Sequence, residues 1–171
     1  MKRVVIAGIG GAGKSTFAAD VARALDLPFT ELDQFVEGPG WTVLPDFVES
    51  TAAFVQQERW VTDSLLYPEV EDLLLARADL VVWLDLPRAL IIRRLVRRTL
   101  ERGLPPRTVL VNGNKERLWA AFSKTSPLRA AWTAHPRHRA HLERVLADRP
   151  HVRLTSPEQA QQWLAAQRPS A

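Results

Sequence analysis

The sequence predicts an α/β fold in which helices cover both faces of a parallel β-sheet, and three observations predict it. Short apolar stretches alternate with longer amphipathic ones, which is the pattern of parallel strands joined by helical crossovers. A glycine-rich loop joins the first apolar stretch to the first amphipathic one. Three apolar stretches end in an aspartate: Asp33, Asp63 and Asp85. The carboxyl ends of parallel strands gather at one edge of a sheet, where ligands bind.

The predicted strands are short runs of apolar residues that end in glycine or in an acid. They cover residues 3–7, 28–33, 60–63, 80–85 and 151–155. The run Leu-Val-Val-Trp-Leu-Asp at residues 80–85 is the clearest of them, because five consecutive apolar residues precede its aspartate.

The predicted helices have apolar residues at helical spacing or open with a proline. They cover residues 15–25, 45–57, 68–78, 87–102, 115–122, 136–147 and 157–167. The Gly-Pro-Gly sequence at residues 38–40 predicts a turn, and residues 103–114 form a glycine- and proline-containing connector.

The composition fits one globular domain spanning residues 1–171, since 46% of the residues are hydrophobic and 25% are charged. No cysteine is present, which excludes disulfides, thiol nucleophiles and thiolate metal sites. No apolar run approaches the roughly 18 residues that span a bilayer, so we expect a cytoplasmic protein. Four histidines lie in the last quarter of the chain, and we interpret them as solvated rather than metal-binding: His135, His138, His141 and His151.

The charges divide unevenly along the chain. Residues 1–85 contain 6 Lys and Arg against 14 Asp and Glu, whereas residues 86–171 contain 17 against 5. Most of the basic residues are arginines, whose planar fork binds phosphate with two parallel hydrogen bonds. The basic second half therefore indicates an anionic ligand.

The loop GIGGAGKS, at residues 8–15, carries the strongest chemical signal in the sequence. It matches the Walker A pattern G-x-x-x-x-G-K-[ST], which joins a strand to a helix and binds phosphate. The backbone N–H groups and the helix N-terminus face the anion, Lys14 reaches the β- and γ-phosphates, and the Ser15 hydroxyl binds Mg²⁺. The predicted nucleotide-binding residues of the loop are Gly8, Gly10, Gly11, Ala12, Gly13, Lys14, Ser15 and Thr16.

We expect ATP rather than GTP as the nucleotide. A GTP-binding protein needs an N-K-x-D motif, and the nearest approach, Asn-Lys-Glu-Arg at residues 114–117, fails at its last position. Only about 155 residues follow the loop, too few for the additional subdomain of a ring ATPase. A small kinase is therefore favoured, with Mg²⁺ and ATP as its cofactors.

The segments GIGGAGKST, LDQF, GW, WVTDS, VVWLDLPR and RRLVRR occur in an order that resembles the adenylate-kinase-like P-loop kinases. Within them the chain most resembles the FlaR-like group, labelled DNA topology modulation kinases. The resemblance implies the three-layer α/β/α P-loop NTPase fold, with a five-stranded parallel sheet in the order 2-3-1-4-5. It also implies an acceptor-binding insert at about residues 34–59 and a helical lid at about residues 99–139.

The same resemblance assigns roles to the strand-end acids. Asp63 is expected to hold the water shell of Mg²⁺ together with Ser15. Asp33 is expected to act as a general base if the acceptor is a hydroxyl, and only to orient an acceptor that is already an anion. Asp85 reads mostly as a helix cap. For Asp63 and Asp33 the alternative is a carboxylate that merely caps the next helix, and for Asp85 the alternative is a direct role.

Four arginines of one predicted helix form two i,i+4 pairs: Arg93 with Arg97, and Arg94 with Arg98. Arg94 and Arg98 match best the pair with which adenylate kinases contact adenine and phosphate; Arg98 is therefore also a catalytic candidate. A solvated basic face is the alternative. The resemblance further places Arg137, together with Arg139, where arginines of a returning lid close on the transferred phosphate.

The predicted acceptor region is aromatic and acidic. Its aromatic residues are Phe35, Trp41, Phe47, Phe54 and Trp60. Its acids are Glu31, Glu37, Asp46, Glu49 and Glu58, and its one basic residue is Arg59. Such a region is a poor receptor for a monophosphate, which favours a neutral or cationic acceptor, although acids that simply face solvent are equally compatible.

The predicted function is ATP-dependent transfer of the γ-phosphoryl group to a nucleotide or a small hydroxylated metabolite. A nucleic-acid-associated P-loop NTPase and a regulatory nucleotide-binding protein are the alternatives. The basic second half favours the former, but no helix-turn-helix, zinc-finger or RNP-like motif occurs. We therefore expect ATP and a small acceptor as partners, and neither a membrane nor nucleic acid. The oligomeric state stays open.

Overall fold

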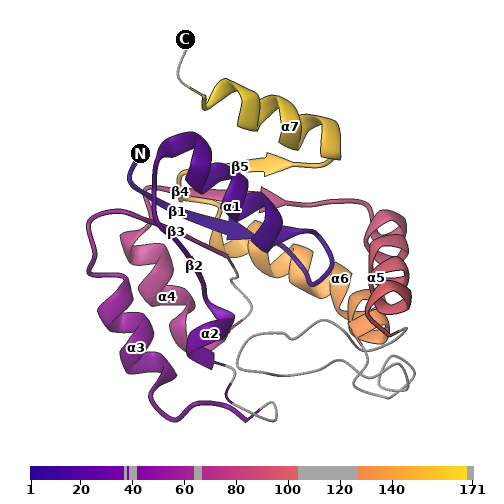
Figure 1. Ribbon diagram of the computed structural model, residues 1–171, viewed down its shortest axis with the longest axis horizontal. Coiled ribbons are helices and arrows are strands. Elements are labelled where there is room, and N and C mark those ends of the chain that lie inside the picture. The colour runs from indigo at the N-terminus through magenta and orange to yellow at the C-terminus, as the bar shows by residue number, and fades with distance from the viewer. Residues whose placement is uncertain (37, 39–41, 64–66, 104–126, 169–171) are drawn as a thin grey trace.

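The computed structural model of the chain describes residues 1–36, 38, 42–63, 67–103 and 127–168. Its centre is a five-stranded, all-parallel sheet in the order β2-β3-β1-β4-β5, which confirms the predicted topology (Figure 1). The strands are β1 (Arg3–Ala7), β2 (Phe29–Glu31), β3 (Trp60–Asp63), β4 (Leu80–Leu84) and β5 (His151–Leu154). The strand order reverses beside β1, so the loop that follows β1 lies at the point where ligands bind in such sheets.

Helices cover both faces of the sheet, as the alternating elements predict. They are α1 (Lys14–Leu25), α2 (Asp33–Val36), α3 (Phe47–Phe54), α4 (Pro68–Arg77), α5 (Arg88–Gly103), α6 (Pro127–Val145) and α7 (Pro157–Ala166). The alternation of β1 shows the two layers, because Val4 and Ile6 belong to a core with α1, α5 and α7, whereas Val5 and Ala7 belong to a core with α3, α4 and α6. Two hydrophobic cores, one on each face, therefore hold the carboxyl ends of the strands in place.

The second strand is shorter than predicted. β2 ends at Glu31, and Asp33 begins the short helix α2 instead of ending the strand. The cause is Leu32, which is completely buried and whose carbonyl accepts a hydrogen bond from the Phe35 N–H at 3.0 Å. The prediction that Asp33 ends the strand was therefore wrong. Asp33 lies two residues after the end of β2, on the first turn of α2.

The helix before β5 begins earlier than predicted. We took Pro136 as its first residue, but α6 begins at Pro127 and contains Pro136 in its interior. Leu142 of α6 and Leu146, which directly follows the helix, are completely buried, and the packing of α6 outweighs the hydrogen bond that an internal proline removes. The predicted helix at residues 115–122 and most of the predicted lid lie outside the described residues.

Two further boundaries differ by a few residues, since α3 covers less than the predicted residues 45–57 and α5 continues to Gly103. Within the described ranges, no helix combines the length and the apolar character that a bilayer span requires.

Candidate functional site

The loop between β1 and α1 adopts a conformation that depends on glycine. Gly11 and Gly13 have positive φ angles of 86° and 91°, which side chains rarely tolerate. A Cβ atom on Gly11 would lie 2.6 Å from Cγ of Leu95 in α5, so the loop packs directly against that helix. Gly13 caps α1 without a side-chain hydrogen bond, which leaves the first N–H groups of the helix available for an anion.

Lys14 extends back over the loop from the first residue of α1. Its Nζ lies 3.5 Å from the carbonyl oxygen of Ile9. Burial lowers the pKa of Lys14, while the negative charges of Asp63 and Asp33 act in the opposite direction. The ammonium group is therefore a partly desolvated cation inside the loop, and a bound phosphate would stabilise its charged form.

Ser15 and Asp63, the two residues expected to bind a metal ion, contact each other directly. The Ser15 hydroxyl donates to Oδ2 of Asp63 at 2.5 Å, and Asp63 is only 3% exposed. The backbone N–H of Leu32 donates to the other carboxylate oxygen at 3.3 Å, which holds the side chain in place. A hydroxyl and a carboxylate are hard oxygen ligands of the kind that Mg²⁺ prefers when phosphates supply other ligands.

No group of three or more His, Asp or Glu side chains in the described part of the chain could hold a metal ion by itself. A Mg²⁺ ion at Ser15 and Asp63 would therefore need the phosphates of a nucleotide to complete its coordination. Thr16 and Gly10 are both exposed, so they are accessible from the solvent side of the loop.

Asp33 lies beside two groups that sequence reasoning did not assign to it. The hydroxyl of Tyr67 donates to Oδ1 of Asp33 at 2.9 Å. Burial raises the pKa of Glu31, and the nearby charges of Asp63 and Asp33 raise it further. Tyr67 could not have been found from local pattern, because it lies 34 residues away. Glu31 could have been, since it precedes Asp33 by two residues at the end of the same predicted strand.

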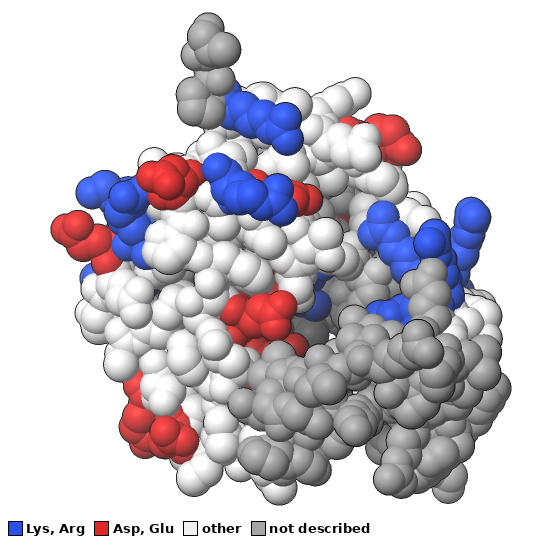
Figure 2. Space-filling model, in the orientation of Figure 1, with Lys and Arg blue, Asp and Glu red and all other residues white. Residues whose placement is uncertain are grey.

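The two arginine pairs of α5 have different environments. Arg93 and Arg97 are exposed, whereas Arg94 and Arg98 are partly buried. Arg94 donates from Nη1 to the carbonyl oxygen of Ala12 at 2.8 Å, so it holds the loop from outside. The positive charge of Arg98 contributes to the low pKa of Lys14, which places it near the ammonium group. Figure 2 shows basic side chains gathered over α5.

Asp85 follows β4 and is enclosed by arginines. The Nη2 and Nε atoms of Arg153 lie 2.6 and 2.9 Å from its Oδ2, and Nε of Arg139 lies 3.5 Å from the same oxygen. Asp85 thus connects β5 and α6 to the end of β4, as expected of a mainly structural acid. Arg137 is exposed on α6, while Arg139 pairs with Asp85 and with Glu143 at 3.4 Å.

The interpretation of all the histidines as solvated was wrong for three of the four. On α6, His135 has its Nε2 3.2 Å from the carbonyl oxygen of Leu86, and His141 has its Nε2 2.7 Å from Oε2 of Glu71. His138 is also partly buried. The helical spacing of the sequence indicates this burial, because His138 precedes the buried Leu142 by four residues and Leu146 by eight.

The predicted aromatic acceptor region divides into two parts. Phe54 and Trp60 are 4% and 0% exposed and belong to the hydrophobic core, so their assignment to a pocket was wrong. Phe35 and Phe47 are only partly buried, and Trp41 lies outside the described residues. The cause is that Trp60 begins β3, the strand next to the central one, whose two faces are both covered.

Arg59 is directed away from the carboxyl edge of the sheet. Its Nη2 donates to the carbonyl oxygen of Asp26 and lies 3.6 Å from an oxygen of the Asp26 carboxylate. Asp26 caps the C-terminal end of α1, the end opposite to the loop, and a 12-residue helix is about 18 Å long. The one basic residue of the insert is therefore remote from Lys14 and Asp33.

The fold is shared with solved structures of small kinases. A sugar kinase from Janibacter sp. HTCC2649 is 21% identical, with a TM-score of 0.55 and coverage of 96% of this chain and 93% of that one. A shikimate kinase from Bacteroides thetaiotaomicron is 15% identical, with a TM-score of 0.60 and coverage of 96% and 95%. A shikimate kinase from Acinetobacter baumannii, solved in complex with shikimate, is 17% identical, with a TM-score of 0.59 and coverage of 97% and 92%.

At these identities the likeness shows the fold alone, that of the P-loop NTPases. It does not support the FlaR-like group or the adenylate-kinase-like subtype specifically. No protein-family model matches the chain, and no curated protein matches it in sequence.

Proposed function

We propose that the chain is a Mg-ATP-dependent kinase that phosphorylates a hydroxyl group of a small neutral or cationic molecule. The observation that carries the proposal is the contact between Ser15 and Asp63, at 2.5 Å, directly beneath a glycine loop that also positions Lys14. This arrangement has the hydroxyl, the carboxylate and the ammonium group that a bound triphosphate and Mg²⁺ require. Bound Mg²⁺ would supply charge neutralisation between the β- and γ-phosphates.

The residues on the acceptor side support a hydroxyl acceptor. In our proposal a carboxylate oxygen of Asp33 accepts the hydroxyl proton as the acceptor oxygen bonds to the γ-phosphorus and the bond to the β-phosphate oxygen breaks. The Tyr67 hydroxyl, 2.9 Å from Oδ1, orients the Asp33 carboxylate. Lys14, Arg98 and Arg137 would stabilise the charge on the transferred group.

The charges of this region support a neutral or cationic acceptor. Burial and the negative charges of Asp63 and Asp33 raise the pKa of Glu31, and Arg59 is directed to Asp26. A nucleoside monophosphate would therefore meet negative charge without a cation from the insert. Shikimate and sugar kinases are among the structural neighbours, which is compatible with a hydroxylated acceptor.

The decisive experiment is ADP release from Mg-ATP, measured against a panel of acceptors. The panel contains neutral sugars, hydroxylated amines such as aminoglycosides, nucleosides and nucleoside monophosphates. We expect turnover with a member of the first three classes and none with the monophosphates. Turnover with a monophosphate alone would contradict the proposed acceptor class, and failure of the chain to bind Mg-ATP in calorimetry would contradict the kinase activity itself.

A further inference from the structure

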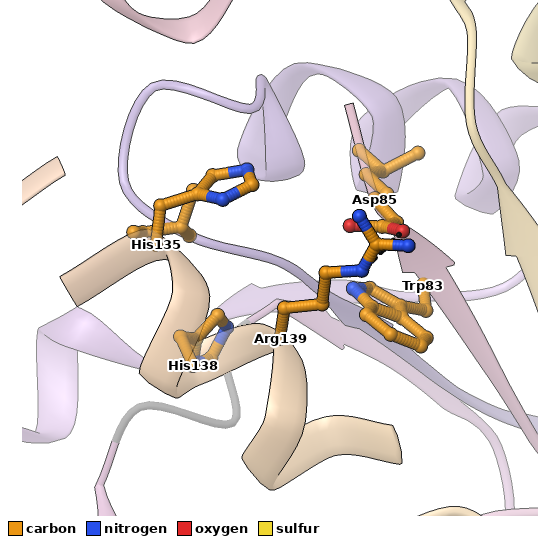
Figure 3. Close-up of a pocket in the computed structure, with 7 residues that line it drawn as sticks. Trp83, Asp85, His135, His138 and Arg139 are labelled. Carbon is orange, nitrogen blue, oxygen red and sulfur yellow. Dashed lines mark ion pairs between the residues drawn. The ribbon is translucent and has the colours of Figure 1, made fainter. Parts of the chain in front are cut away.

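A small pocket lies between the nucleotide loop and α6. Its lining comes from three parts of the chain: Ile9 of the loop, Trp83, Leu84 and Asp85 at the end of β4, and His135, His138 and Arg139 of α6. Figure 3 shows the three α6 side chains on the helix beside the end of β4 that carries Trp83 and Asp85. The pocket is therefore next to the loop on the side opposite to Asp33 and Tyr67.

His138 is the unusual member of this pocket. Its Nε2 atom is fully enclosed and has no hydrogen-bond partner among the described residues. The two neighbouring histidines of α6 are partnered, His135 by the Leu86 carbonyl and His141 by Glu71. Buried polar side-chain atoms are nearly always hydrogen-bonded, so an open ring nitrogen beside a ligand-binding loop indicates a partner that arrives with the ligand.

The charge state of His138 suits such a partner. Burial, followed by the positive charge of Lys14, lowers the pKa of His138 to about 4. The charged and titratable groups that face it come from the loop, from the end of β4 and from its own helix: Lys14, Asp85, His135, His141 and Arg139. At neutral pH the imidazole of His138 is therefore uncharged, so it does not place a second positive charge beside Lys14.

We propose that Nε2 of His138 binds an oxygen of the terminal phosphoryl group held by the loop, and that His138 takes up a proton when this group binds. The inference rests on the proposed binding of Mg-ATP by the loop. In the free protein, the positive charge of Lys14 disfavours protonation of His138. A terminal phosphoryl group bound at Lys14 brings negative charge to the same side of the imidazole. The charged imidazolium then becomes favourable, because an adjacent anion stabilises it and Nε2–H donates to the oxygen.

The sign of the effect follows from these two states. His138 is neutral above about pH 4 in the free protein, and its pKa is higher in the complex. Between these two pKa values the complex holds more protons than the free protein, so binding takes up protons and affinity falls as pH rises. An arginine at this position would give no such dependence.

The test is calorimetry with the Mg²⁺ complex of the β,γ-imido analogue of ATP at pH 6, in buffers of different ionisation enthalpy. The variant His138→Gln keeps an amide donor but does not titrate, and His151→Gln is the matched control on the exposed surface of β5. We expect the wild type and His151→Gln to take up a larger fraction of a proton on binding than His138→Gln. His138→Phe, which lacks a donor, should bind about tenfold more weakly than His138→Gln.

Equal proton uptake by the wild type and His138→Gln, both of which bind the analogue, would overturn this inference and leave the proposed kinase activity standing. Absence of any nucleotide binding by the wild type would overturn both. If His138→Gln does not fold, the ¹⁵N shift of Nε2 in the wild type decides instead. It should move toward the imidazolium value on addition of the analogue at pH 6, and an unchanged shift would contradict the inference.

Discussion

The two halves of the carboxyl edge of the sheet hold their aspartates in different ways. On the half formed by β2 and β3, Asp33 and Asp63 contact the hydroxyl groups of Tyr67 and Ser15. On the half formed by β4 and β5, Asp85 contacts two guanidinium groups. A hydroxyl orients a carboxylate without neutralising it, whereas a guanidinium group neutralises it. The aspartates of the first half can therefore receive a proton or a metal ion, whereas Asp85 of the second half fastens elements together.

The largest effect is expected at Lys14, whose ammonium group interacts with the negative charges of Asp63 and Asp33 in the first half. Lys14→Met keeps the apolar stem and removes the charge, so kcat/KM for Mg-ATP should fall by at least about 10³-fold. Because burial already lowers the pKa of Lys14, loss of the charge should not lower the thermal midpoint. Steady-state kinetics and thermal unfolding measure the two effects, and a variant that keeps its turnover would refute the assignment of the loop.

The next effect distinguishes Asp33 from Asp85 by the same substitution. Asp33→Asn should lower kcat by about 10²-fold, because an amide does not accept the acceptor proton, and the variant should still bind Mg-ATP. Asp85→Asn is the control, and its kcat should stay within about threefold of the wild type at a temperature where it is folded. If the two variants lost turnover equally, the division of the edge into a chemical and a structural half would be wrong.

For the free energy of unfolding we expect the reverse order, with Asp85→Asn more destabilising than Asp33→Asn. Asp85→Asn removes the negative charge from a carboxylate whose side chain is 5% exposed and which pairs with Arg153 and Arg139. We expect the free energy of unfolding to fall by about 2 kcal/mol, since the charge-assisted hydrogen bonds from Arg153 to a buried carboxylate are lost, although Glu143 remains as a counter-charge to both guanidinium groups. Urea denaturation should show this loss for Asp85→Asn and a smaller one for Asp33→Asn, whose contact is with a hydroxyl.

The smallest expected effect is a pH dependence of the free energy of unfolding, caused by His138 beside the β4–β5 half of the edge. The pKa of His138 lies at about 4 in the folded protein against an ordinary value of 6.5, so the unfolded chain binds the proton more readily. The contribution of neutral His138 is therefore complete above pH 6.5 and is lost as pH falls toward 4. Between pH 7.5 and about pH 5.8, the free energy of unfolding should fall by about 1 kcal/mol more for the wild type than for His138→Gln.

The parts of the site that could be predicted from the sequence are those fixed by local spacing. The loop residues and the acid that ends β3 were found in this way, because eight consecutive residues determine the loop and a buried strand delivers Asp63 directly to its end. The sheet order followed from the resemblance that these segments carry. Asp33 was identified as a candidate residue, but its secondary structure was predicted wrongly. The turn at Leu32 depends on the burial of Leu32 against other elements, which local spacing does not indicate.

The parts that could not be predicted depend on contacts between distant segments. Tyr67 reaches Asp33 across 34 residues, and Arg153 reaches Asp85 across 68. The environment of His138 depends on how α6 packs beside the loop and the end of β4. Pro136 obscured this helix, because a proline inside a helix resembles one that begins a helix. Phe54 and Trp60 look the same in the sequence whether they line a cavity or fill a core.

The contact between Gly11 and Leu95 has a consequence for how such a chain can change over generations. Position 11 has no room for a methyl group as long as position 95 carries a leucine, and Arg94, the residue next to it, holds the same loop through Ala12. The positive φ of Gly11 strains any side chain, whatever residue stands at position 95, so position 11 is expected to stay glycine and position 95 to accept only residues no larger than leucine. Among natural variants of this chain, glycine should therefore persist at position 11 even where position 95 has changed.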